Sequence, residues 1–167
     1  MTQAGLSHPK LSDGGHAPDP RTLRDVLSCF ATGVAVATTV GQTGAPVGMT
    51  INSFNSVSLD PPLILWSLSL TAPSLPAFRA HDSFAINMLS TQQADLCHRF
   101  SRPAADKFQG VAWTPGLHGV PLLDDALASL ECRVWRRYEG GDHEIIIGRV
   151  LDLRSTDKPP LVFHRGR

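Results

Sequence analysis

The chain reads Gly48-Met-Thr-Ile-Asn-Ser-Phe-Asn-Ser-Val-Ser-Leu-Asp-Pro-Pro62 where an apolar segment gives way to a polar one. Hydroxyl and amide side chains are interspersed there with apolar ones, and two prolines end the run. This pattern suits a strand leaving a sheet, because proline cannot donate to a strand ladder. Uncharged polar groups with apolar neighbours predict a site for a polar ligand with a flat aromatic body. An ordinary loop of Asn, Ser and Pro stays open as the alternative.

Strands are predicted on both sides of this segment. β-Branched and small residues fill 34–40, and a turn at 41–44 leads to a second run at 46–51, which together predict a β-hairpin. Further strands are predicted at 63–68, 84–89, 128–138 and 143–153, with a turn at Gly140-Gly141 between the last two. Residues 161–163 are expected to close the sheet.

Helices are predicted to be short. Asp19 offers an N-cap oxygen and Pro20 suits a first helical position, so we expect a helix that ends near Gly33. Others are expected at 74–80 and from Thr91 through Arg99, followed by an exposed loop at 101–110. Many strands with few long helices predict a mainly β fold, an antiparallel barrel whose ends are covered by short helices.

Composition limits the classes of function. The 167 residues predict a flexible arm at 1–18 and one domain at 19–167. Lys plus Arg and Asp plus Glu number 15 each, so we expect no nucleic acid as a partner. Apolar runs are short and no secretory signal begins the chain, so we expect no membrane span and a cytoplasmic location. Three separated cysteines predict free thiols, and scattered histidines predict no metal site.

Four regions of the chain resemble the short-chain flavin reductase family, the small reductase components of two-component flavin-dependent monooxygenases. They are Phe30-Ala-Thr-Gly-Val34, Gly48 to Pro62, Phe84-Ala-Ile-Asn-Met-Leu-Ser90, and Gly141-Asp-His143 with Ile147-Gly-Arg-Val150. The resemblance implies an FMN-binding split barrel that forms a homodimer. It further implies that FMN or FAD is reduced by NADH or NADPH and passed to a separate monooxygenase.

Matched residue by residue, the resemblance also implies a site. His143 matches the family histidine associated with nicotinamide binding, and it is the candidate catalytic residue. The C-terminus, ending in Arg167, departs from the family's aromatic residues around a glycine. Flavin contacts are implied at Thr50, Asn52, Ser53, Ser56, Val57, Ser58 and Asp60, and at the Lys107-Phe108 pair.

The expected chemistry explains which motifs the sequence lacks. Hydride transfer from nicotinamide to flavin takes place between two cofactors, so the protein needs no acid or base of its own. No hydrolase, zinc-protease or phosphate-loop motif is present in the sequence. Taken without the resemblance, His143 reads as a surface turn residue and Glu144 as an exposed strand residue. Arg133, Arg136 and Arg137 read as a solvated strand edge.

Three alternatives remain at this stage. The first is a flavin-binding module that does not turn its flavin over. The second is a split-barrel protein of another chemistry, resembling pyridoxine-phosphate oxidases or handling haem. The third is an interaction domain without a ligand. The sequence decides neither FMN against FAD nor NADH against NADPH.

Overall fold

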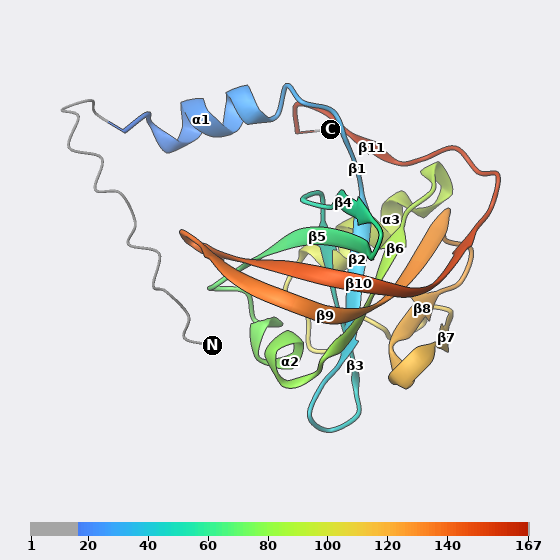
Figure 1. The fold of residues 1–167 in the computed structure, drawn as a ribbon. Helices are drawn as coiled ribbons and strands as arrows, with labels where there is room; N and C mark the ends of the chain where they lie inside the picture. The colour runs from blue at the N-terminus through green and yellow to red at the C-terminus, as the bar shows by residue number, and fades with distance from the viewer. Residues whose placement is uncertain (1–16, 167) are drawn as a thin grey trace, which may run out of the picture.

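The computed structural model describes residues 17–166, so all but the last two residues of the expected arm at 1–18 lie outside it. Its main element is a seven-stranded antiparallel sheet with the order β3-β2-β6-β9-β10-β5-β4 (Figure 1). The mainly β prediction is therefore confirmed. The strands are β2 Ala35–Val40, β3 Pro46–Ile51, β4 Asn55–Leu59, β5 Pro62–Ser69, β6 Ser83–Met88, β9 Ala128–Gly140 and β10 His143–Ser155.

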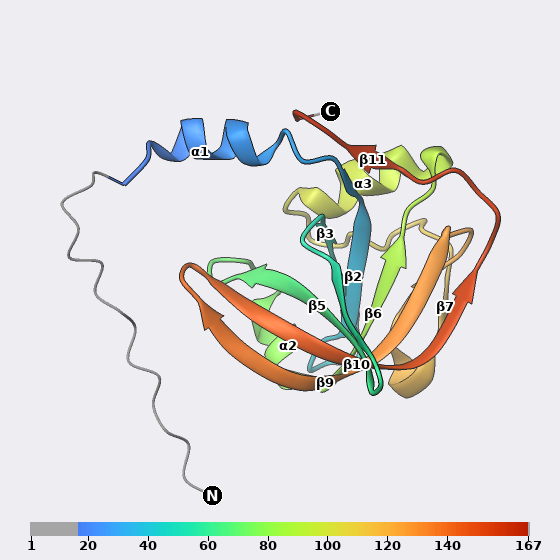
Figure 2. The same ribbon diagram turned by 45° about the horizontal axis from the view of Figure 1, so that its top comes forward.

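The segment from Gly48 to Pro62 makes this sheet curl. The edges of the sheet are β3 and β4, yet these strands follow one another in the chain with only residues 52–54 between them. A connection of this length spans at most about 14 Å, so the two edges must approach each other. No ladder joins β3 to β4 in the part of the chain that the model covers, and the barrel stays split there. Figure 2 shows the curled sheet.

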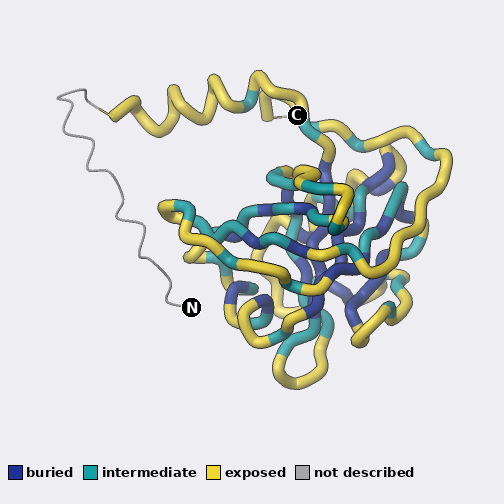
Figure 3. Tube along the Cα trace, viewed as in Figure 1, coloured by how far each residue is buried: buried dark blue, intermediate teal, exposed yellow. Residues whose placement is uncertain are grey.

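The core lies inside this curl (Figure 3). The Trp66 ring is fully buried, with ring centroids 5.0 Å from Phe78 and 5.7 Å from Phe84. Phe78 comes from α2, Leu75–Ala80, which therefore covers one opening of the barrel. Gly148 admits the Phe84 ring, because a Cβ atom at this position would overlap Phe84 Cζ.

The first helix, α1, spans Pro20–Leu27, and the Asp19 carboxylate caps it by accepting a 3.0 Å hydrogen bond from the Thr22 N–H. It ends well before Gly33, because Thr32–Gly33 form β1 instead. No residue of α1 is buried, and the helix extends away from the barrel (Figures 1 and 3). The helix expected from Thr91 is a 3₁₀ turn, η1 Thr91–Gln93, followed by α3 Ala94–Ser101.

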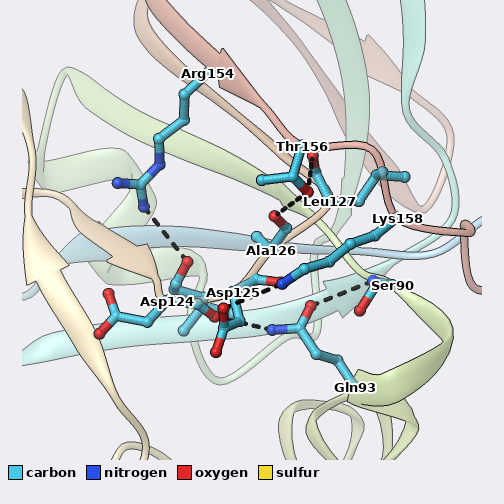
Figure 4. Close-up of polar contacts among 10 residues, drawn as sticks. Ser90, Gln93, Asp124, Asp125, Ala126, Leu127, Arg154, Thr156 and Lys158 are labelled. Carbon is cyan, nitrogen blue, oxygen red and sulfur yellow. Dashed lines mark hydrogen bonds and ion pairs between the residues drawn. The ribbon is translucent and has the colours of Figure 1, made fainter.

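Two expectations for the strands are corrected. Residues 161–163 do not close the sheet, because β11, Val162–Phe163, pairs with β1. The preceding segment is tied to residues 123–127, which lead into β9: Arg154 donates to the backbone oxygen of 123, Lys158 to that of 125, and Thr156 to those of 126 and 127 (Figure 4). The polar run that reads as a loop contains the edge strand β4. A further small sheet joins β7 Trp113–Pro115 to β8 Pro121–Leu123, with η2 Leu117–Gly119 between them.

Within residues 17–166, no helix combines the length and the apolar character needed to cross a membrane.

Candidate functional site

A cavity of about 1410 Å³ lies beside β3, the strand in which the segment from Gly48 to Pro62 begins. One wall is β3 itself, with the apolar side chains of Val47 and Met49. The opposite wall is α3 and the loop at 101–108. Residues 72–74, which precede α2, and residues 161–163 around β11 complete the lining.

Gly48 explains why α3 and the following loop fold against β3. A Cβ atom at Gly48 would meet Phe100 Cε1 at 2.8 Å and Phe108 Cε2 at 3.3 Å, so only glycine leaves space for both rings. Both rings are buried, and their centroids lie 5.0 Å apart in an edge-on arrangement. The loop expected to be exposed therefore contributes Phe108 to a buried cluster.

Lys107 places a cation in the cavity wall. Its Nζ donates to the Phe100 oxygen at 2.9 Å and to the Gly48 oxygen at 3.4 Å, which occupies two of its three N–H groups. Partial burial lowers the pKa of Lys107 below its ordinary value. Asp106 fixes the backbone of the loop by accepting from the N–H groups of Phe108 and Gln109. One ammonium proton of Lys107 is thus left for a ligand.

Thr50 and Asn52 bring part of the predicted polar run into this cavity. The Thr50 hydroxyl donates to the Cys97 oxygen at 2.8 Å and so joins β3 to α3. Asn52 lies where the chain crosses the split, and its side chain is exposed. The Cys97 thiol also lines the cavity, and burial raises its pKa. The thiol therefore stays protonated at neutral pH.

The rest of the polar run does not line the cavity. The Ser53 side chain instead takes the place that the backbone of a neighbouring strand would have beside Ser67 of β5. Its Oγ accepts from the Ser67 N–H at 3.0 Å and donates to the Ser67 oxygen at 3.2 Å. Val57 lies at a bulge between two residues of the β4 ladder. Asp60 lies in the turn between β4 and β5, whose Asp60-Pro61 bond is cis. The residues outside the cavity lining are Ser53, Ser56, Val57, Ser58 and Asp60.

His143 also lies outside the cavity lining, at the tip of the β9–β10 hairpin. Its Nδ1 is 2.7 Å from an Asp142 carboxylate oxygen, and its side chain is 43% exposed. The hydrogen bond with His143 lowers the pKa of Asp142. The hairpin tip is nevertheless close in the chain to the cavity, because His143 pairs with Ser69 and the wall begins at Ala72.

Two sequence readings near this tip are wrong. Glu144 is not an exposed strand residue, because its side chain is only 12% exposed and accepts from both Arg79 and Arg137. Arg137 is not part of a solvated edge, because it also donates to the Phe78 oxygen. Arg133 and Arg136 are exposed as expected, but they do not lie on a strand edge, because β9 runs between β6 and β10. The sequence concealed the Arg79–Glu144 pair because Arg79 lies 65 residues from Glu144.

Sequence reasoning also missed the cationic rim of the cavity. This rim consists of Arg102 and Lys107, and the polar side chains of His98 and Ser101 line the cavity beside them. They belong to the end of α3 and to a loop that reads as ordinary solvent-exposed sequence. The available signal was Gly48, since a glycine inside a strand marks the close approach of another segment.

The chain is similar to known proteins in sequence and in structure. The protein-family model described as the flavin reductase like domain matches residues 27–167. A protein of Rhizobium meliloti (strain 1021) named "Probable flavin reductase" is 44% identical over 148 residues, which cover 89% of this chain and 48% of that protein. The chain thus spans about half of that relative's length.

Two further proteins are similar over most of their length. The flavin-dependent monooxygenase reductase subunit HsaB of Rhodococcus jostii (strain RHA1) is 40% identical over 152 residues, covering 90% of this chain and 77% of HsaB. The NADH:FAD oxidoreductase SgcE6 of Streptomyces globisporus C-1027, solved with NAD and FAD fragments, is 38% identical. Its TM-score is 0.85, and the match covers 98% of this chain and 94% of that one. The chain belongs to the family of the flavin reductase like domain.

Proposed function

We propose that the protein is an NAD(P)H-dependent flavin reductase, which reduces FMN or FAD and supplies the reduced flavin to a separate monooxygenase. The observation that carries this proposal is the cavity beside β3, which joins an apolar wall to a cationic rim. Relatives named as a flavin reductase and as a monooxygenase reductase subunit support it.

The residues of the cavity fit a flavin. Its volume of about 1410 Å³ exceeds the range of about 300–1,000 Å³ that is usual for one small ligand, so a flavin and a nicotinamide ring have space together. Val47 and Met49 offer apolar cover for a ring face. Lys107 and Arg102 offer positive charge for a phosphate tail. Asn52 offers amide donors for the oxygen atoms of the ring.

Each wall has a separate task in the proposed reaction. Bound flavin supplies a ring nitrogen that accepts hydride from the nicotinamide. The apolar wall of β3 excludes water from the ring face, and Lys107 holds the anionic end, which fixes where the ring lies. The protein has no proton to move, so its contribution is to orient the two rings and to exclude water.

The remaining site residues enter as proposals of the same kind. His143 is proposed to accept a hydrogen bond from the nicotinamide carboxamide N–H at Nε2, since its Nδ1 faces the Asp142 carboxylate and donates to it. The flavin contacts of Ser53, Ser56, Val57, Ser58 and Asp60, on and around the edge strand β4, are retained as proposals. They would engage parts of the flavin that extend beyond the cavity.

We propose a homodimer as the working assembly. The apolar side chains Leu23, Val26, Leu27 and Phe30 are 44–77% exposed on and just after a helix that stands away from its own barrel. Exposed apolar residues also continue along β9 and β10, from Trp135 to Leu153. Exposed apolar patches of this kind mark interfaces. In a dimer with a two-fold axis, the apolar residues of α1 in each copy would cover those of β9 and β10 in the other copy.

A cytoplasmic location is also proposed. The nicotinamide co-substrate is held in that compartment, and Cys29, Cys97 and Cys132 are all free thiols, as is usual in a reducing compartment.

The direct test is steady-state oxidation of NADH and NADPH, followed by absorbance with FMN and then FAD as acceptor. We expect turnover above the uncatalysed background and saturation with at least one flavin. A protein that binds flavin and keeps it oxidised in the presence of both nicotinamides would contradict the proposed activity. A particle of monomer mass in light scattering at micromolar concentration would contradict the dimer.

A further inference from the structure

A carboxylate clamp lies beside the hairpin tip, outside the cavity. Glu144 Oε2 accepts from Arg79 Nη2 at 2.8 Å and from Arg79 Nε at 3.1 Å, in a geometry that fixes the guanidinium plane. Its other oxygen accepts from Arg137 Nη1 at 2.6 Å. Arg137 in turn donates to the backbone oxygen of Phe78. Glu144 therefore joins the β9–β10 hairpin to α2 directly through Arg79, and it also contacts Arg137 of β9, which makes its own bond to α2.

The place of this clamp suggests a purpose beyond packing. Glu144 directly follows His143, whose own side chain contacts the exposed Asp142 carboxylate through Nδ1. On the other side, α2 begins right after residues 72–74, which form a cavity wall. The Leu70 N–H donates to the Asp142 oxygen at 3.0 Å, so the hairpin tip and the chain leading to that wall also touch directly.

We propose that Glu144 is a positioning residue, which clamps the hairpin tip carrying His143 to α2 and so sets where His143 stands relative to the cavity. The inference rests on the proposed function, because it takes His143 to meet the nicotinamide. Removing the carboxylate leaves Arg137, with a side chain only 24% exposed, without its ion-pair partner. The tip then loses its Arg79 link to α2, and Arg137 loses the partner that holds it against the Phe78 oxygen, while the β3 wall and Lys107 keep their own contacts.

The test compares Glu144→Gln and Arg79→Met with the wild-type protein. Arg79 is 51% exposed, so its variant keeps the fold if Glu144→Gln fails to fold. Lys158→Met is the matched control, because it removes the Lys158–Asp125 ion pair on another part of the barrel (Figure 4). For each protein, KM for NADH, KM for FMN and kcat are measured, and amide hydrogen exchange is followed at residues 140–144.

We expect Glu144→Gln to raise KM for NADH about tenfold and to leave KM for FMN within about twofold, because the clamp acts on the nicotinamide side alone. Arg79→Met should change KM for NADH in the same direction by less, and Lys158→Met should change neither constant. Exchange at 140–144 should quicken about tenfold in Glu144→Gln.

An unchanged KM for NADH, or equal rises in both constants, would overturn the positioning role. If the wild-type protein reduces no flavin, the proposed function fails instead. Hydrogen exchange then decides the clamp by itself, because exchange at 140–144 as slow in Glu144→Gln as in the wild type refutes it.

Discussion

Gly48→Ala offers a sharp test of how the cavity is built. The added methyl group would lie 2.8 Å from Phe100 Cε1, 2.9 Å from Phe100 Cδ1 and 3.3 Å from Phe108 Cε2. The Phe100 ring can move only by disturbing its neighbours, because it is 1% exposed and packed edge-on against Phe108, which itself packs against Trp113. The substitution therefore pushes α3 and its loop away from β3.

The size of the effect follows from two opposing terms. Overpacking a buried cluster costs about 1–3 kcal/mol, whereas replacing glycine inside a strand returns about 0.5–1 kcal/mol. We expect a net loss of about 1.5 kcal/mol in the free energy of unfolding, equivalent to a fall in Tm of about 5 °C for a domain of this size. The displaced Phe100 and Gly48 oxygens also release Lys107, so KM for flavin should rise.

The assay is urea unfolding followed by circular dichroism, together with KM for FMN. Gly33→Ala is the matched control, because a Cβ atom at Gly33 meets nothing within 4 Å. Phe100→Leu combined with Gly48→Ala should cost less than the sum of the two single changes, because the smaller side chain makes room. Equal stability of Gly48→Ala and Gly33→Ala would refute the account of the cavity wall.

Three further outcomes are expected. Alkylation of the half-buried Cys97 by a maleimide should be slower than that of the exposed Cys29, and saturating FMN should slow it further; mass spectrometry of the digested protein measures both rates. Lys107→Met should raise KM for FMN about tenfold in steady-state assays, since it removes one charge-assisted contact worth about 1.5 kcal/mol, with Lys158→Met unchanged as the control. Burial raises the pKa of Glu144, but bonds from Arg79 and Arg137 outweigh it and leave the pKa below the ordinary 4.5. The stability that Glu144 contributes is thus present above that value and lost as the pH falls through the lowered pKa, so the urea midpoints of wild type and Glu144→Gln should converge as the pH falls below 4.5.

Short-range signals in the sequence predicted most of the strands. The β2–β3 hairpin and the β9–β10 hairpin follow from β-branched runs and nearby turn residues, and the Asp19 cap correctly marks where α1 begins. β4 and β11 were misjudged because their pairing depends on partners outside their own segment. A Ser-rich strand becomes stable only against β5, and β11 finds β1 at the other end of the chain.

The residues of the candidate site likewise fall into those that the local sequence predicts and those that it does not. Thr50 and Asn52 follow from a local polar pattern, whereas Lys107 and Phe108 came from the family resemblance alone. These four residues are brought together because Phe100 of α3 packs in the space that Gly48 leaves. Gly48 and α3 are far apart in the chain, so the sequence does not predict this contact. Ion pairs such as Glu144 with Arg79 are equally hidden, because a charged residue in a strand looks the same whether solvent or an arginine faces it.

The cavity and the hairpin tip are structurally coupled, although His143 lies outside the cavity lining. Ser69 pairs with His143, the Leu70 N–H binds the Asp142 oxygen, and the cavity wall begins at Ala72, so only a few residues connect the two surfaces. Glu144 fixes the same pair of elements from the other side through α2. A ligand that orders one surface therefore lowers the entropy of ordering the other, and this coupling must act equally in both directions. Flavin and nicotinamide are accordingly expected to strengthen each other's binding, and in Glu144→Gln the loss of this coupling is expected to stay within the roughly twofold change allowed for KM of FMN.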